Sequence, residues 1–403
     1  MTKNKAKWLA LRMIVYFWIL KIKNMKNILI TAFSLLTSLA IAQDTLSFEP
    51  IVQWDANPVE SQGITGTCWS YSTSSFLESE LIRMGKGSHN LSEIFIARQV
   101  YLNKADNYVR RHGKTQFGEG SLGHDLLNAV DDYGIVPNEV FNGLQTESEI
   151  HNHKELATIL EGYVKAVVSN KGKKLTPLWK KGYTALLDVY LGEYPESFTY
   201  DGKEYTPRSF ATSLEIKASD YITITSYTHE PFNSSFILGI PDNWDNGIFY
   251  NTDLNDLVGQ TKKALKKGYT IEWDADVSNK GFNSKEGIAV VALEDEEPNF
   301  ETTAEEMDVT QEIRQENFDN YTVTDDHLMH IVGLVKGVDG KEYFVVKNSW
   351  GDERGLVDYK GHVLVSEAYF KLNTISVMFH KDALIRSKQK TNKNISTPVR
   401  EIY

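Results

Sequence analysis

The sequence has one cysteine among its 403 residues, so it cannot form an internal disulfide. A lone thiol is either a small buried residue or a nucleophile. Repeats and low-complexity linkers are also lacking. A composition of 41% hydrophobic and 24% charged residues is that of a globular chain, which excludes collagen, coiled coil and wholesale disorder. The length suits two or three domains or one elaborated enzyme domain.

Basic residues are in deficit, with 43 Lys and Arg against 54 Asp and Glu and a net charge of −11. Residues 1–42 contain seven basic residues and no acidic ones. The remainder therefore has 36 basic and 54 acidic residues, a net charge of −18. A surface this negative repels phosphate backbones, so we expect no nucleic-acid partner.

Long apolar runs are confined to the N-terminal region. After Met25 and Lys26, the run Ile28–Ala42 ends in Ala40-Ile41-Ala42, which has the small-x-small pattern of a signal-peptidase site. The pattern predicts a secretory signal that starts at Met25 and is cleaved after Ala42, with residues 1–24 as an upstream extension. We therefore expect an exported protein, periplasmic or extracellular, without stable membrane insertion after cleavage. An uncleaved anchor is the alternative.

Periodicity predicts helices first and strands later. Helical spacing occurs at residues 68–84 and 123–133, and helical and loop patterns mix between about 140 and 265. Apolar or alternating patterns then predict strands at Tyr269–Asp274, Met329–Lys336, Tyr343–Asn348 and Gly361–Val365. This order favours an α+β protein with two facing halves. Residues 294–308, eight of them acidic, are expected to form a solvated loop.

The cysteine lies where a glycine-containing loop, Gln62 to Thr67, becomes the helix that begins near Cys68. A helix N-terminus carries partial positive charge and favours a thiolate. The Gln62 amide, six residues before the thiol, can converge with the Cys68 N–H to form an oxyanion hole. A structural cysteine at a helix start is the alternative.

A base for this thiol is expected from a strand that histidines open. His327 and His330 precede an apolar run, and alternation puts them on opposite faces, so only one can face the thiol. Downstream, Asn348 follows another buried-looking strand. Its carbonyl can hold an imidazole in the useful tautomer while Trp350 shields that hydrogen bond from water. Asn348 as a simple turn residue is the alternative.

These three segments together resemble the papain superfamily of cysteine peptidases. Gln62…Gly66-Thr67-Cys68-Trp69 resembles its nucleophile loop, and Lys347-Asn348-Ser349-Trp350-Gly351 is similar to its asparagine motif. Gly333, six residues after His327, identifies His327 as the family's base. The resemblance implies a two-lobed fold, with the nucleophile helix in a helical lobe and the histidine and asparagine in a β-barrel-like lobe.

Spacing indicates a branch of that superfamily. Cys68 and His327 are 259 residues apart, whereas papain-like enzymes separate them by about 130 to 150. The large insertion, expected at about 140–265 within a peptidase domain spanning 43–380, resembles the bleomycin hydrolase and aminopeptidase C branch. Further similar segments are Gly134–Pro137, Tyr205–Phe210, Asp276-Val277 and Phe282–Gly287. The branch implies aminopeptidase activity on peptides and a possible homohexamer. The polar tail at 381–403 differs from that family's ending.

Two further segments bear on the site. Where the branch has a Gly-Gly pair for substrate binding, this chain has Gly120-Ser121. Gly118–Gly123 matches a dinucleotide-binding pattern but follows no strand, and His151 and His153 are expected to be solvated rather than metal ligands. We expect neither a metal nor an organic cofactor.

The expected function is hydrolysis of peptide bonds by Cys68, His327 and Asn348 with Gln62 as oxyanion donor, most simply by trimming peptides from the N-terminus. The nearest alternative is an endopeptidase of the same fold. Two other classes remain open: a papain-like acyltransferase and a non-catalytic peptide-binding scaffold.

Overall fold

The computed structural model describes residues 47–172, 174–301 and 304–384. By its internal contacts, the described chain from Phe48 onward forms one compact unit. The predicted signal segment, residues 1–42, lies outside the described residues. So does the predicted tail after its first four residues. Within the described part of the chain, no helix is long and apolar enough to cross a membrane.

Most helices begin at a hydroxyl or carboxylate side chain. In five of the helices, the side chain of the N-cap residue accepts a hydrogen bond from a backbone N–H of the first turn. These N-cap residues are Ser92, Thr206, Asp253, Thr310 and Ser366. The helices are α2 (Cys68–Arg83), α3 (Glu93–Arg110), α4 (Gly123–Tyr133), α5 (Lys154–Val168), α6 (Leu178–Leu191), α7 (Pro207–Leu214), α8 (Leu254–Lys266), α9 (Gln311–Asp319) and α10 (Glu367–Asn373), with short 3-10 turns at η1 (Ala218–Asp220), η2 (Val357–Tyr359) and η3 (Lys381–Ala383).

One large sheet dominates the second half of the chain. In the described residues its strand order is β5-β6-β4-β13-β7-β10-β11-β12-β9-β8, and β1 pairs with β10. Its strands are β1 (Phe48–Gln53), β4 (Tyr221–Thr225), β5 (Ser234–Ile237), β6 (Ile248–Asn251), β7 (Ile271–Ala275), β8 (Phe282–Asn283), β9 (Ile288–Ala289), β10 (His327–Gly337), β11 (Glu342–Lys347), β12 (His362–Ser366) and β13 (Thr374–His380). A separate hairpin joins β2 (Phe198–Tyr200) to β3 (Lys203–Tyr205).

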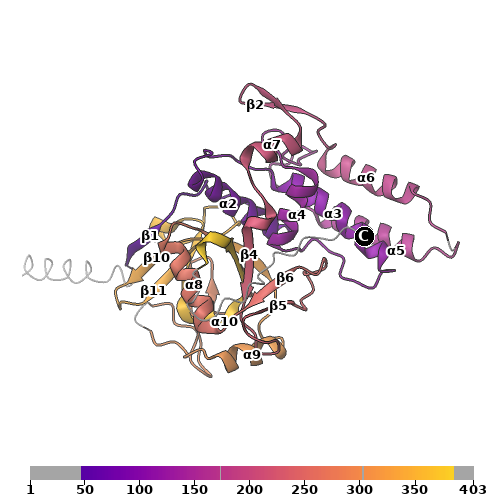
Figure 1. Ribbon diagram of the computed structural model, residues 1–403. Coiled ribbons are helices and arrows are strands. Elements are labelled where there is room, and N and C mark those ends of the chain that lie inside the picture. The colour runs from indigo at the N-terminus through magenta and orange to yellow at the C-terminus, as the bar shows by residue number, and fades with distance from the viewer. Residues whose placement is uncertain (1–46, 173, 302–303, 385–403) are drawn as a thin grey trace, which may run out of the picture. The chain divides into compact units, whose positions relative to one another are not determined.

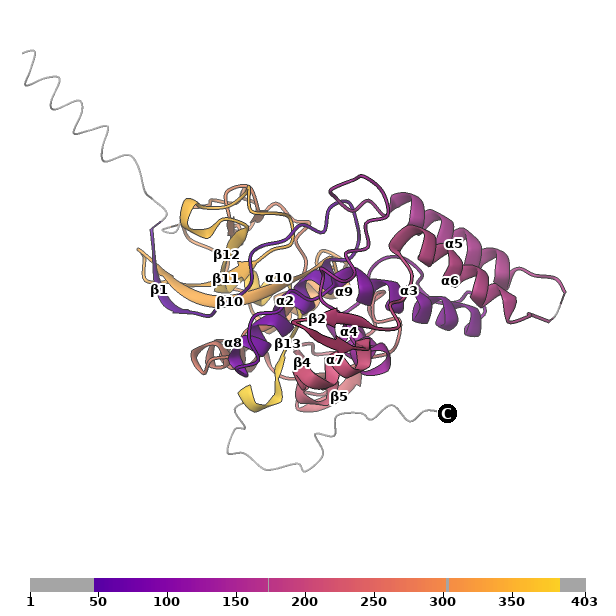
Figure 2. The same ribbon diagram turned by 90° about the horizontal axis from the view of Figure 1, so that it is seen from above.

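The apolar residues gather in two cores, one for each lobe. The helical-lobe core comes mainly from α2 to α7, and the β-lobe core mainly from the sheet with α8 and α10. Figures 1 and 2 show α3 to α7 on one side of α2 and the strands β10 to β12 on the other. The predicted α+β, two-lobed architecture is confirmed.

Helix α2 is the element that joins the two lobes. Every residue from Cys68 to Leu81 is buried, because α2 packs on α3 and α4 in one lobe and on β7 and β10 in the other. Its sequence supplies small hydroxyl residues, which permit close packing and can hydrogen bond across the interface. The residue that begins α2 is thereby held against the start of β10.

Most predicted elements match the structure within two residues, including α2, α4, β7, β10, β11 and β12. The structure adds detail to two of the predictions. The segment 140–265 is divided between the lobes, because α5, α6 and α7 join the helical lobe whereas β4, β6 and α8 join the β lobe. The packed chain also extends past residue 380: Ala383 is fully buried and Lys381 pairs with Asp220 at 2.7 Å.

Gly333 shows why one position in the histidine strand lacks a side chain. Strand β1 pairs with β10 there, with Gln53 opposite Gly333. A Cβ on Gly333 would lie 2.5 Å from the Val52 carbonyl oxygen. We expect Gly333→Ala to lower the free energy of unfolding by about 1–3 kcal/mol, measured by denaturant unfolding. Gly239, which has open space at its Cβ position, gives the matched control Gly239→Ala. Equal stability of the two variants would contradict this account of the close contact between β1 and β10.

Candidate active site

Cys68 is the first residue of α2, so its thiol lies at the N-terminal end of a 16-residue helix. The side chain of the preceding Thr67 makes no capping hydrogen bond, and the described first turn has no acidic residue. The Cys68 side chain is 8% exposed. Burial raises the pKa of the thiol to about 12, while the N–H groups of Leu328 and Trp69 act in the opposite direction. Contact with Leu328 places the thiol beside the start of β10.

His327 opens β10, and its ring is fixed on two sides. Its Nε2 lies 2.8 Å from Asn348 Oδ1, and its ring stacks on Trp350 with centroids 4.7 Å apart. Asn348 Oδ1 also accepts the Ser349 N–H at 2.7 Å, which identifies this atom as the amide oxygen. An oxygen can only accept, so Nε2 carries the proton and Nδ1 is the basic nitrogen of the neutral ring.

Burial opposes charge on both the thiol and the imidazole in this arrangement. Burial lowers the pKa of His327 to about 4, and the hydrogen bond to Asn348 opposes that shift only in part. The same cause raises the pKa of Cys68. Removing both groups from water therefore opposes the thiolate and imidazolium pair that the helix N-terminus favours.

His330 occupies a different environment from His327, as alternation along the strand predicts. Its Nδ1 lies 3.0 Å from Ser75 Oγ on α2, and its ring stands edge-on to Phe76. Burial lowers the pKa of His330 well below its ordinary range. The two histidines of the motif therefore have different partners, and of the two only His327 hydrogen bonds to Asn348.

Gln62 is tied to the asparagine segment rather than left to move freely. Its backbone N–H donates to the Ser349 carbonyl at 2.9 Å, and its Oε1 accepts the Ser349 hydroxyl at 2.6 Å. Its Nε2 donates one hydrogen to the Thr65 carbonyl at 2.7 Å. A primary amide nitrogen has two hydrogens, so one remains available to an oxyanion. The structure therefore holds Gln62 and Asn348 in one hydrogen-bonded unit.

The segment with the two candidate substrate-binding residues runs alongside the nucleophile loop. The Trp69 indole donates to the Glu119 carbonyl at 2.9 Å, and the Gly120 carbonyl accepts the Lys104 ammonium. Ser121 is 1% exposed, and its hydroxyl donates to Asp125 at 2.6 Å. The Ser121 side chain is therefore committed to packing, and the Gly120 carbonyl is already paired with Lys104.

Sequence reasoning missed the loop that joins β5 to β6. Its Trp244 indole donates to Ser121 Oγ at 2.9 Å, and Asn243 holds the loop closed through hydrogen bonds to Leu238 and Gly247. Asp242, in the same loop, packs its carboxylate directly against Gly120. A Pro-Asp-Asn-Trp run reads as an ordinary turn, and nothing local in the sequence shows where it docks.

The His151–His153 segment is also closer to the site than the sequence suggested. His153 is 4% exposed, because the segment packs on the nucleophile loop: the Ile64 N–H donates to the His151 carbonyl at 2.8 Å. The expectation of a solvated segment was wrong for His153. In the parts of the chain that are described, no group of three or more His, Cys, Asp or Glu side chains could hold a metal ion.

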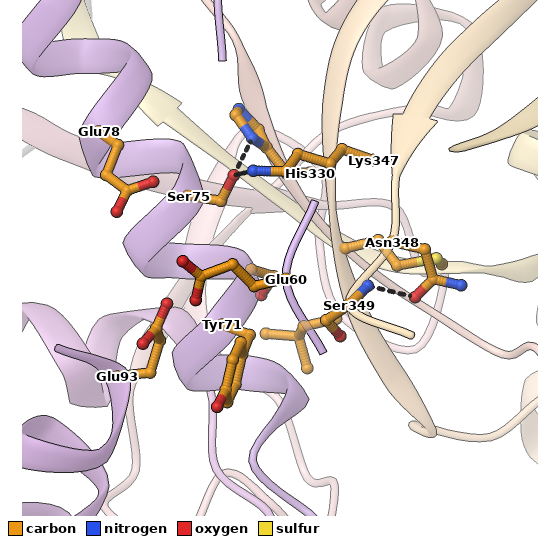
Figure 3. Close-up of a pocket in the computed structure, with 12 residues that line it drawn as sticks. Glu60, Tyr71, Ser75, Glu78, Glu93, His330, Lys347, Asn348 and Ser349 are labelled. Carbon is orange, nitrogen blue, oxygen red and sulfur yellow. Dashed lines mark hydrogen bonds between the residues drawn. The ribbon is translucent and has the colours of Figure 1, made fainter. Parts of the chain in front are cut away.

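A small polar cavity of about 20 Å³ lies behind the asparagine segment, between α2 and the strands β10 and β11. Figure 3 shows Lys347 and His330 meeting at Ser75, with the carboxylates of Glu60, Glu78 and Glu93 on the opposite side. Burial raises the pKa of Glu78 to about 7. The volume suits one water molecule and excludes a substrate side chain, so this cavity supports the site rather than forming its binding pocket.

Comparison with known proteins places this geometry in a family. The model of the peptidase C1-like family matches residues 102–400. The chain belongs to the peptidase C1-like family. It is therefore a cysteine peptidase of papain-like fold, and the resemblance seen in its three motifs is confirmed. The family match includes His327 and Asn348 but begins after Cys68 and Gln62, so the placement of the nucleophile loop depends on the structure itself.

A solved structure agrees with the fold of this peptidase C1-like chain. The crystal structure of PepW from Lactobacillus rhamnosis HN001 superposes with a TM-score of 0.67 at 18% identity, covering 88% of this chain and 89% of that one. At this identity the likeness concerns the fold. A search of curated proteins found no match.

The raised pKa of the Cys68 thiol leads to a pH prediction. Cys68 is the only cysteine, so alkylation by iodoacetamide reports on this one group. Because burial raises the pKa of Cys68 to about 12, we expect the alkylation rate of the free enzyme to keep rising with pH up to at least pH 9. Intact-protein mass spectrometry across pH 4–9 measures the rate. A rate that stays constant from about pH 4 upward would show a preformed thiolate and contradict the raised pKa of Cys68.

Proposed function

We propose that this peptidase is a thiol aminopeptidase in which Cys68 is the nucleophile, His327 the general base and Asn348 the residue that orients the base. The observation that carries the proposal is the hydrogen bond from His327 Nε2 to Asn348 Oδ1 under the Trp350 ring. It supports a histidine whose free nitrogen, Nδ1, serves a thiol next to the same strand. Peptides are the proposed substrates, trimmed from the N-terminus.

The reaction begins with proton transfer from the Cys68 thiol to His327 Nδ1 as sulfur attacks the scissile carbonyl carbon. The Cys68 N–H and the remaining Gln62 Nε2 hydrogen stabilise the negative charge on the carbonyl oxygen. His327 then donates its proton to the leaving amine, and a thioester remains on Cys68. Water, deprotonated by His327, hydrolyses the thioester and frees the N-terminal residue. Neither a metal nor a cofactor takes part in these steps.

A mixed peptide library tests this proposal directly. Incubated with the enzyme under reducing conditions, free-amine peptides should lose residues stepwise from the N-terminus, and Cys68→Ala should remove all turnover. Product masses give the cleavage positions. Internal cuts that depend on Cys68 would contradict the aminopeptidase proposal while leaving the nucleophile in place. An uncleaved library with both proteins would contradict peptide hydrolysis altogether.

Asn348 offers a test of the base. In Asn348→Ala the His327 ring loses the acceptor that selects its tautomer, so we expect kcat to fall by about 10- to 100-fold with little change in KM. Asn320→Ala, an exposed asparagine at the end of α9, is the matched control and should match the wild type. Steady-state kinetics on one peptide supply both constants. An unchanged kcat in Asn348→Ala would remove Asn348 from the mechanism.

A further inference from the structure

Three carboxylates from separate parts of the chain gather beside the nucleophile. Asp242 lies in the β5–β6 loop, Asp325 lies two residues before His327, and Asp274 lies on β7 opposite Leu328. The negative charges of Asp242 and Asp325 both act on the Cys68 thiol, after burial the next causes that raise its pKa. Asp325 in turn lies close to Asp242 and Asp274. The negative charge of this cluster therefore reaches the reacting sulfur.

The hydrogen-bond partners of these carboxylates are other acids and neutral groups. Asp325 and Asp274 hydrogen bond to each other, Asp325 also accepts the Asp242 N–H, and Asp242 hydrogen bonds with Gln116. Both oxygens of Asp325 and both of Asp274 are buried. Asp274 is fully buried. Burial raises the pKa of Asp325 to about 7, with the Asp242 charge as a further cause. Such a group of acids gains stability from a cation placed among them.

Lys104 supplies only part of that positive charge. Its ammonium faces Asp242, Asp125, Asp325 and Glu119, but it donates its hydrogen bond to the Gly120 carbonyl. Burial lowers the pKa of Lys104, while the charges of these acids act in the opposite direction. Several acids thus face one lysine, and the balance favours a second cation from outside the chain.

Asp242 also closes the segment along which a longer peptide would lie. Its carboxylate packs so closely on Gly120 that a Cβ added there would overlap both carboxylate oxygens. The position is rigid, because Asn243 braces the loop and Trp244 anchors it to Ser121. A peptide that reaches Cys68 along Gly120 therefore meets a carboxylate in place of open backbone.

We propose that Asp242 and Asp325 form a receptor for a primary ammonium group, the α-ammonium of the substrate residue that Cys68 acylates. This inference rests on the proposed aminopeptidase function and assigns its specificity to two residues. The carboxylates bind the free N-terminus as charge-assisted acceptors, and the bulk of Asp242 against Gly120 excludes residues that would precede it. The restriction to N-terminal residues is then built into the β5–β6 loop.

The test compares one peptide in three forms: with a free α-amine, with the α-amine replaced by hydrogen, and with an Nα-acetylated lysine as its first residue. The last form offers a side-chain ammonium without an α-ammonium. Each is measured as kcat/KM on the full-length chain for wild type, Asp242→Asn and Asp325→Asn. Asp295→Asn, an exposed acid in the 294–308 loop, is the matched control. Thermal unfolding of each variant checks that it is folded.

In the wild type we expect the free-amine peptide to exceed its desamino analogue by about 10- to 100-fold, the size of one or two charge-assisted hydrogen bonds. Asp242→Asn and Asp325→Asn should each shrink this ratio at least several-fold, whereas Asp295→Asn should keep it. A loss of rate that is equal for both peptides leaves the ratio unchanged and would reflect a structural role, which overturns the receptor.

The remaining outcomes are separable from one another. Cleavage of the acetyl-lysine peptide as fast as the free-amine peptide, lost in Asp242→Asn, would show that a side-chain ammonium is bound and overturn the α-ammonium assignment. A wild type with a strong free-amine preference that both Asp variants retain would overturn the receptor and leave the aminopeptidase intact. A wild type that cuts only internal bonds would overturn the aminopeptidase proposal and this inference with it.

Discussion

The hydrogen bond between His327 and Asn348 is the interaction on which the chemistry of this site depends. It ties the start of β10 to the end of β11 and is covered on one side by Trp350. Because Asn348 accepts from Nε2, Nδ1 is the nitrogen left for proton transfer. Gln62 is joined to the same segment through Ser349, so base and oxyanion donor are positioned by one hydrogen-bonded unit.

Burial is the second constraint, and it opposes charge throughout the site. Helix α2 lies between two apolar lobes, so the thiol at its first residue, the histidine of β10 and the carboxylates of Asp274 and Asp325 are all removed from water. The consequence is a resting site in which burial raises the pKa of the thiol, lowers the pKa of the imidazole and raises the pKa of Asp325. A cationic substrate that binds near Asp242 and Asp325 offsets their negative charge, which raises the pKa of Cys68. Substrate binding is thereby coupled to the reactivity of the thiol.

The sequence predicted the parts of this site that are local in the chain. A helix that begins at Cys68, a strand that begins near His327 and an amide that follows the next strand each leave a short pattern, and the two-lobed fold follows from their order. Long-range docking left no such pattern. The contact between Asp242 and Gly120, and the burial of His153 against the nucleophile loop, join segments far apart in sequence. The raised pKa of Cys68 depends on that same packing, which helix position alone does not reveal.

The central claim is that Cys68 becomes acylated by the N-terminal residue of a peptide. Rapid mixing of the enzyme with an excess of a free-amine peptide ester, followed by acid quench and peptide mapping by mass spectrometry, observes this intermediate. The account predicts a thioester adduct on the peptide that contains Cys68, with the mass of one N-terminal residue. An adduct on another residue, or product formation without any adduct on Cys68 at any time, would contradict it.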